Sequence, residues 1–270
     1  MSASTESSES FQIPTEAAEF YESAFVPAFF AQWAPILCEA AGVGPGQRLL
    51  DVACGTGIVA RTAADLVAPN GKVIGLDLNE AMLAVARRTR PGIEYHQGDA
   101  AALPFPDRSF DVVLCQLALM FFPDRAQALA EMGRVVTPGG TVAAVVPSRL
   151  DTQVAFSAFV DLAARHAGPA AVSLLSTYFV CGDLDELTGL IESTGLKVTS
   201  AHTHVGVYRA PSVDAFVTTE VESTPLIERI SDEVYQRIRT DARDVLAPFT
   251  AADGTVEAPF GCHVLAAHHR

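Results

Sequence analysis

The stretch Leu49–Ala60, LLDVACGTGIVA, decides the fold of this sequence. Its first half belongs to a nearly all-apolar run at 48–53, which is typical of a strand buried on both faces of a parallel sheet. Gly55 and Gly57 follow, and Ile58 opens a helical pattern. Glycines let the backbone approach a ligand closely, and free N–H groups at a helix start attract a negative group. The stretch therefore predicts a strand, a turn and a helix, with the turn as a cradle for a nucleotide-type ligand.

Strand and helix patterns alternate along most of the chain. Before the turn, apolar spacing predicts a helix at 15–31 with a kink or boundary at Pro27, and a second helix at 32–41. After it we expect strands at 72–77, 93–97, 110–116, 140–146, 197–207 and 261–267. We expect helical segments at 57–67, 79–89, 125–135, 148–181, 184–194, 212–222 and 232–247. This order predicts an α/β fold with a doubly wound, Rossmann-like sheet of about seven strands.

Composition excludes several classes of protein. The 270 residues carry 18 Lys and Arg against 32 Asp and Glu, a net charge of −14, so nucleic acid and anionic membranes are poor partners. Five cysteines, none closer than sixteen residues to the next, fit neither a disulfide framework nor a zinc ribbon, and favour a reducing compartment. No signal peptide opens the sequence, and no apolar stretch reaches the roughly 20 residues that span a bilayer. We expect a cytoplasmic protein without membrane insertion.

An acidic residue follows the second expected strand. Asp77 lies 22 residues after Gly55, and a carboxylate there can accept hydrogen bonds from both hydroxyls of a ribose. Asp77 can instead cap the helix that begins near Asn79, and the two roles can coexist. Gly55, Gly57 and Ala60 also match the G-x-G-x-x-G/A dinucleotide fingerprint, which keeps a nicotinamide-dependent oxidoreductase open as an alternative.

Four motifs together carry a resemblance to a known family. They are LLDVACGTG at 49–57, VIGLDLNEAML at 73–83, YHQGDAAALPFPDRSFDVVLCQLALMFF at 95–122 and EMGRVVTPGG at 131–140. Over about residues 45–147 the chain resembles the class I S-adenosylmethionine-dependent methyltransferases, particularly their ubiquinone/menaquinone-biosynthesis-like small-molecule branch. The resemblance implies S-adenosylmethionine as cofactor. It also implies that the last two strands form a hairpin, with the final strand antiparallel.

At the methionine end of that cofactor, the resemblance assigns five residues. Gly55 and Gly57 would line the methionine portion, and Asp51 would lie near its ammonium group. Gln116 would face the methionine chain, and Tyr21 would close over the cofactor. Tyr21 can equally be a core residue.

At the nucleoside end, the resemblance assigns five more. Asp77 would bind the ribose, and Leu78 would pack on the adenine, with Met82 in the same neighbourhood. Asp99 would accept a hydrogen bond from the adenine amino group, beside Ala100. The alternatives are a turn role for Asp99 and ordinary helix packing for Leu78 and Met82, and both interpretations require the latter two to be buried.

The implied chemistry needs little from the protein beyond positioning. A sulfonium methyl group is already activated, so an acceptor atom held in line with it suffices and no metal is required. If the acceptor must lose a proton, His166, His202 and His204 are candidate bases, although a structural role is favoured for each. Cys54 lies beside the glycines, but no partner for a nucleophilic thiol is evident, so we reject that role.

The chain is expected to form one domain. It would span 13–270 after a disordered tail at 1–12, with the cofactor-binding core at 45–147. Apolar helical segments at 148–181 and about 208–250 predict a cap over the carboxyl ends of the strands and a small, largely apolar acceptor. The accepting atom (O, C or N) and the oligomeric state stay open, as does a non-catalytic cofactor-binding or partner-binding module.

Overall fold

The computed structural model describes residues 14–222 and 224–269, so the predicted tail at 1–12 lies outside the described residues. In that part of the chain, seven strands form one sheet in the order β3-β2-β1-β4-β5-β7-β6. The strands are β1 (Arg48–Val52), β2 (Lys72–Asp77), β3 (Glu94–Gln97), β4 (Phe110–Gln116), β5 (Val136–Pro147), β6 (Leu196–Ala210) and β7 (Val256–His269). The predicted Rossmann-like sheet is confirmed.

Strand direction changes only toward one edge of the sheet. β1 pairs in parallel with β2 and β4, and β3 and β5 continue the parallel arrangement outward. β7 is antiparallel to both of its neighbours, β5 and β6, which confirms the expected antiparallel last strand. The strand order reverses between β1 and β4. In open α/β sheets, ligands bind outside the carboxyl ends of the strands at such a switch point.

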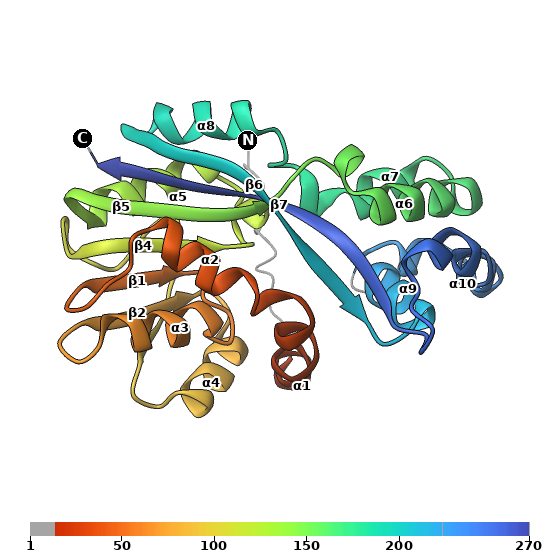
Figure 1. The fold of residues 1–270 in the computed structure, drawn as a ribbon, viewed down its shortest axis with the longest axis horizontal. Coiled ribbons are helices and arrows are strands. Elements are labelled where there is room, and N and C mark those ends of the chain that lie inside the picture. The colour runs from red at the N-terminus through yellow and green to blue at the C-terminus, as the bar shows by residue number, and fades with distance from the viewer. Residues whose placement is uncertain (1–13, 223, 270) are drawn as a thin grey trace, which may run out of the picture.

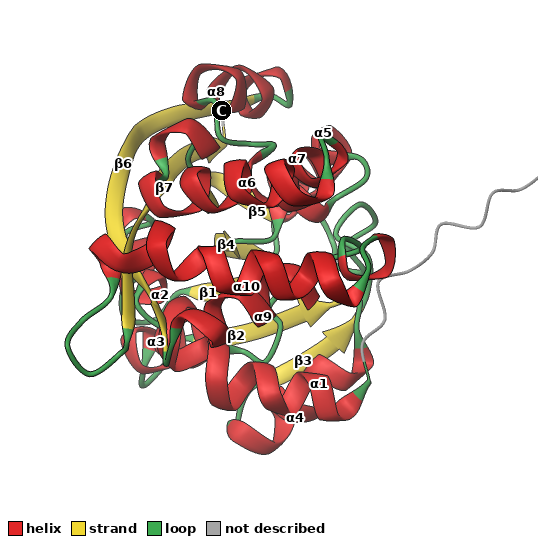
Figure 2. Cartoon of the chain, turned by 90° about the vertical axis from the view of Figure 1, so that its right-hand side faces the viewer, coloured by secondary structure: helices red, strands yellow, loops and turns green. Residues whose placement is uncertain are grey.

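Ten α-helices accompany the described strands. They are α1 (Thr15–Phe20), α2 (Trp33–Ala40), α3 (Ile58–Val67), α4 (Glu80–Thr89), α5 (Arg125–Val135), α6 (Val154–Ala167), α7 (Ala170–Leu175), α8 (Leu184–Ser193), α9 (Val213–Glu222) and α10 (Asp232–Leu246). The parallel strands point toward the right of Figure 1, where α6, α7, α9 and α10 lie beyond their ends. Figure 2 shows the same helices from that side, in front of the sheet. We call these four helices the cap.

The two antiparallel strands are longer than the sequence pattern predicts. The expected strands at 197–207 and 261–267 are observed at 196–210 and 256–269. β5 ends where Pro147 pairs with Cys262, so the beginning of β7 has β6 as its only strand neighbour and continues into the cap (Figure 1). A free strand edge tolerates proline, which explains how Pro259 lies within β7.

The N-terminal segment departs from the expected single helix at 15–31. α1 ends at Phe20, and Tyr21–Phe30 forms a π-helix, η1, with Pro27 inside it. Proline lacks a backbone N–H, and its ring clashes with the carbonyl one turn earlier in an α-helix. Wider winding relieves that clash, and π-helical turns are frequent at functional sites. We call η1 the lid, because it lies over the turn described below.

One glutamine fastens the end of the lid to β6. Gln32 donates from Nε2 to the carbonyl oxygen of Val207 at 2.8 Å and accepts from the N–H of Val207 at 2.9 Å. Gly206 makes this approach possible, since a Cβ there would lie 2.5 Å from Oε1 of Gln32 and 2.8 Å from the fully buried Trp33. The lid and the β6–β7 hairpin are therefore joined by a strand-like pair of hydrogen bonds.

A single tyrosine ring determines why β2 contains a glycine. Tyr95 on β3 pairs in register with Gly75, and a Cβ at Gly75 would lie 2.6 Å from the ring and 2.9 Å from Sγ of Cys54. We predict that Gly75→Ala destabilises the fold by about 2 kcal/mol, because overpacking a closed interior forces strain. The midpoint of urea unfolding measures it. Gly92→Ala is the matched control, since a Cβ there meets no atom within 4 Å. Equal unfolding midpoints for the two variants would contradict the packing argument.

Candidate functional site

The turn between β1 and α3 has an unusual backbone. Ala53, Gly55 and Gly57 all have left-handed φ angles, of 55°, 54° and 88°. An alanine in that region carries strain, and such strain gathers at functional sites. Gly57 is required twice over, because a Cβ there would also lie 2.6 Å from the hydroxyl oxygen of Tyr95. The expected strand, turn and helix are therefore present, and the Tyr95 ring packs against the turn at Gly57.

Two carboxyl groups hold the turn in place, that of the buried Asp51 and that of the half-buried Asp77. Asp51 at the end of β1 accepts a hydrogen bond from the N–H of Ala60 at 2.9 Å. Asp77 at the end of β2 accepts from the N–H of Gly55 and from that of Asn79, each at 2.8 Å. Asp77 thus ties the turn to the neighbouring strand and to the start of α4.

The capping alternative for Asp77 is wrong. Asn79 is the N-cap of α4, and its side chain accepts hydrogen bonds from the N–H groups of Ala81 and Met82. Asp77 lies two residues before Asn79, at the end of β2, and accepts from the N–H groups of Gly55 and Asn79. Its carboxylate orders the turn, and each of its oxygens retains further capacity to accept.

Burial changes the proton affinity of both acids. Burial raises the pKa of Asp51 from 3.8 to about 8, against the opposing effect of the Ala60 N–H, and the nearby charge of Asp77 raises it further. Burial also raises the pKa of Asp77, while its backbone N–H donors lower it. Because both pKa values are raised, a cation in the turn would stabilise the ionised carboxylates, and the two groups therefore favour a cationic ligand.

Tyr21, at the start of the lid, lies against the turn. A Cβ at Gly55 would lie 3.9 Å from its ring, and its ring centroid is 4.8 Å from that of Phe30. Burial, and then the charges of Asp77 and Glu22, raise the pKa of its hydroxyl far above the usual range. The structure therefore brings Tyr21 together with the glycine turn, as expected.

Gln116, at the end of β4, is hydrogen-bonded to the lid. It is buried, and its Nε2 donates to the carbonyl oxygen of Phe30 at 3.1 Å. Its Oε1 is buried and has no hydrogen-bond partner among the described residues. Gln116 therefore lies between the strand ends and the lid, with one acceptor available.

The nucleoside-end residues lie around the ends of β2 and β3. Leu78 is 43% exposed, so the expectation of burial is wrong for it: the chain turns outward there, before α4 begins at Glu80. Met82 is half-buried and Ala100 is buried. Asp99 is exposed and accepts from the N–H of Ala101 at 2.8 Å, so it does occupy a turn. That bond leaves acceptor capacity on its carboxylate.

The candidate bases lie away from this turn. His166 on α6 contacts Asp241 on α10 at 2.8 Å, which joins two cap helices. His202 and His204 are exposed on β6, and the ring of His204 packs edge-on against Trp33. Burial raises the pKa of the Cys54 thiol well above its usual range, so this thiol stays protonated and the rejection of a nucleophilic role stands.

Sequence reasoning missed one ion pair beside the turn. Glu22 of the lid contacts Arg61 of α3 at 2.8 Å, and Arg61 also donates to the carbonyl oxygen of Thr56 at 2.6 Å. The position of Glu22 next to Tyr21, and of Arg61 one helical turn after Gly57, was the available signal. This pair connects the lid to the turn electrostatically.

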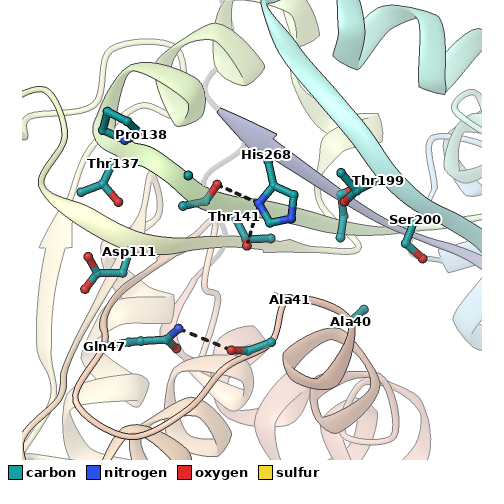
Figure 3. A pocket seen from close by; sticks show the side chains of 14 residues that line it. Ala40, Ala41, Gln47, Asp111, Thr137, Pro138, Thr141, Thr199, Ser200 and His268 are labelled. Atoms are coloured by element: carbon teal, nitrogen blue, oxygen red, sulfur yellow. Dashed lines mark hydrogen bonds between the residues drawn. The ribbon is translucent and has the colours of Figure 1, made fainter. Parts of the chain in front are cut away.

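A cavity of about 490 Å³ lies at the other end of the strands, where they begin (Figure 3). Gln47, Thr141 and His268 line it, near the beginnings of β4 and β5. The His268 ring contacts Thr141 at 3.5 Å and the Gly140 carbonyl at 3.3 Å. This cavity is separate from the glycine turn, because it lies at the N-terminal ends of the strands and the turn follows their carboxyl ends.

Within 14–222 and 224–269, no group of three or more His, Cys, Asp or Glu residues could hold a metal ion. None of the helices described there is long and apolar enough to cross a membrane.

Comparison with known proteins identifies the core. Residues 50–144 match the family model described as a methyltransferase domain. The demethylmenaquinone methyltransferase of Renibacterium salmoninarum is 45% identical over 109 residues, which cover 40% of this chain and 45% of that protein. The ubiquinone/menaquinone biosynthesis C-methyltransferase UbiE of Hahella chejuensis is 37% identical over 150 residues, 53% of this chain and 60% of that protein.

A solved structure extends the likeness to the whole fold. Phosphoethanolamine N-methyltransferase 2 of Haemonchus contortus, solved with phosphomonomethylethanolamine and S-adenosylhomocysteine, gives a TM-score of 0.57 at 21% identity. The match covers 94% of this chain and 57% of that one. The chain spans about half the length of the curated relatives it matches. Residues 50–144 thus match a methyltransferase domain and are similar to part of the demethylmenaquinone and ubiquinone/menaquinone C-methyltransferases, within a Rossmann-like fold shared with a solved methyltransferase.

Proposed function

We propose that this protein transfers a methyl group from S-adenosylmethionine to a small, largely apolar acceptor. The observation that carries the proposal is the glycine turn at the switch point of the sheet, held by Asp51 and Asp77 and covered by Tyr21. The domain match over 50–144 supports it. The oxidoreductase alternative has no support from that match or from the relatives above.

Buried polar atoms without a hydrogen-bond partner indicate that the turn suits this cofactor. The hydroxyl of Thr56 and Oε1 of Gln116 are buried and have no hydrogen-bond partner among the described residues. Leaving such groups unpaired costs about 1–3 kcal/mol each, and a ligand that carries ammonium, carboxylate and hydroxyl groups supplies partners. We assign the methionine end to Gly55, Gly57 and Asp51, with Gln116 and Tyr21 enclosing it.

The nucleoside end follows from the exposed side chains beyond β2 and β3. Asp77 retains acceptor capacity for the ribose hydroxyls. Leu78 projects as an exposed apolar surface beside it, which suits one face of the adenine, and Met82 is half-buried nearby. Asp99 and Ala100 complete the nucleoside site at the end of β3.

The chain's role in the reaction is to position and to exclude water. The bound cofactor would supply a methyl group activated by a positively charged sulfur. The lid covers the turn with aromatic rings, and holding an acceptor in line in such an enclosure contributes much of the rate acceleration. No other chemical group is needed for an acceptor that is already nucleophilic.

The acceptor is proposed to be apolar because aromatic rings continue from the lid into the cap. Phe29 packs on Phe30, on Tyr208 of β6 and on Phe260 of β7. Glu220 of α9 is buried beside this cluster, and burial raises its pKa to about 7. The Tyr208 hydroxyl donates a hydrogen bond to this carboxyl group, which places a polar pair within the aromatic cluster.

The wider setting is proposed from composition. We propose a single domain with the cap as its acceptor side, acting on a small molecule and not on nucleic acid, given the net charge of −14. The five cysteines are all buried and unpaired, which suits a reducing compartment such as the cytoplasm.

Binding and turnover test the proposal. The wild-type protein should bind S-adenosylhomocysteine in isothermal titration, and Asp77→Ala should weaken that affinity about 100-fold, since it removes a charged acceptor. Asp65→Ala, on the exposed part of α3, is the control and should bind normally. Radiolabelled methyl transfer to a panel of phenols and quinols then separates an enzyme from a binding module. Unchanged affinity in Asp77→Ala would contradict the assignment of the cofactor site to this turn.

Cofactor binding should also release a proton from Asp51. Its pKa of about 8 keeps it largely protonated at pH 7, and a cation placed beside it lowers that pKa. Titration at pH 7 in buffers of different ionisation enthalpy should show release of up to about one proton per site. Asp51→Asn should bind with little proton release, and equal release from both proteins would contradict the assignment.

Stability provides the control for that variant. The folded-state pKa of about 8 lies above the unfolded value of 3.8, so the folded chain holds the extra proton between these values. Its contribution to stability is therefore lost as the pH rises toward 8. Asp51→Asn lacks this loss. The Tm of the variant minus the Tm of the wild type should therefore increase between pH 6 and pH 9.

A further inference from the structure

We propose that the site distinguishes the methyl donor from the demethylated product by charge, and that Glu22 of the lid and Arg61 of α3 set this discrimination in opposite directions. The inference rests on the proposed function and adds to it two specificity-determining residues. The donor carries one more positive charge than the product, at sulfur. A site with an excess of negative charge therefore favours the donor and releases the product.

Three carboxyl groups gather around the glycine turn from three different elements. Asp51 comes from β1, Asp77 from β2 and Glu22 from the lid. Asp51 accepts from the N–H of Ala60 and Asp77 from that of Gly55, while Glu22 pairs with Arg61, which donates to the carbonyl oxygen of Thr56. These contacts place all three carboxyl groups around the turn. Asp51 is 1% exposed, so at least one member is shielded from bulk water.

Positive charge at the turn is smaller. Arg61 contacts one oxygen of Glu22 and the carbonyl of Thr56, and it also acts on Asp51. The other oxygen of Glu22, Oε2, is buried and has no partner among the described residues. One guanidinium therefore faces three carboxyl groups, of which Asp51 is largely protonated at pH 7 until a cation binds beside it, and its own partner Glu22 retains an unsatisfied acceptor.

An independent feature indicates that a ligand completes this arrangement. Thr56 lies inside the turn, is 1% exposed, and its hydroxyl has no partner in the described part of the chain. Gln116, 9% exposed beneath the lid, has an unpartnered Oε1. Buried acceptors without a partner among the described residues thus occur in the turn at Thr56, at the strand end at Gln116 and in the lid at Glu22, and such acceptors suit a cationic ligand.

The charge argument predicts opposite signs for two substitutions. Glu22→Gln removes a negative charge and leaves Arg61 uncompensated, so affinity for the donor should fall more than affinity for the product. Arg61→Gln removes the opposing positive charge, so the preference for the donor should rise. A single charge in a partly buried site changes such a preference about three- to tenfold.

The experiment measures the dissociation constants of S-adenosylmethionine and S-adenosylhomocysteine for each full-length protein by isothermal titration. The donor-to-product affinity ratio should fall about three- to tenfold in Glu22→Gln and rise by a similar factor in Arg61→Gln. Glu19→Gln is the matched control, because Glu19 on the exposed surface of α1 pairs with Arg88 of α4, and its ratio should equal that of the wild type.

Two results overturn the inference and one overturns the proposed function instead. A purely structural role for the ion pair would weaken both ligands equally and leave the ratio unchanged in both variants. Shifts of the same sign in both variants would also exclude discrimination by charge. A wild-type protein that binds neither ligand would refute the proposed function itself, and that outcome is distinct from the other two.

Discussion

The carboxylate of Asp77 is the contact on which the candidate site depends. It accepts from the backbone of the glycine turn and from the backbone at the start of α4, so one side chain joins β1, β2 and the following helix. Hydrogen bonds from N–H groups to a charged acceptor are worth about 1.5–3 kcal/mol. The left-handed residues at 53, 55 and 57 need such support, because their conformation is costly for an unsupported chain.

A tyrosine provides the second constraint on the turn. The Tyr95 ring lies across Gly75 and under Gly57, so one aromatic side chain requires two glycines on neighbouring segments. Sequence reasoning identified Gly57 from the motif and attributed it to ligand approach. The structure adds that the protein's own packing excludes a Cβ at that position. The glycine pattern is therefore a requirement of the fold as much as of a ligand.

Most of the sheet could be predicted from periodicity, because strands buried on both faces read as continuous apolar runs. The antiparallel last strand came from resemblance and was confirmed, whereas the strand order was first given by the structure. The π-helix was not predictable, since Pro27 indicates a break without specifying its geometry. Leu78 was expected to be buried because packing on adenine and packing of helix on sheet both require it, but it is 43% exposed in the short link between β2 and α4. Glu22 and Arg61 were missed because their contact joins segments 39 residues apart.

The paired hydrogen bonds between Gln32 and Val207 have a consequence for motion. The same amide closes the N-terminal segment over the turn and continues the edge of a hairpin that extends into the cap. Lifting one element without the other breaks both bonds and leaves a half-buried amide and a strand backbone unpaired. Separating the N-terminal segment from β6 therefore costs the free energy of both hydrogen bonds at once, so displacement of either element bears directly on the other.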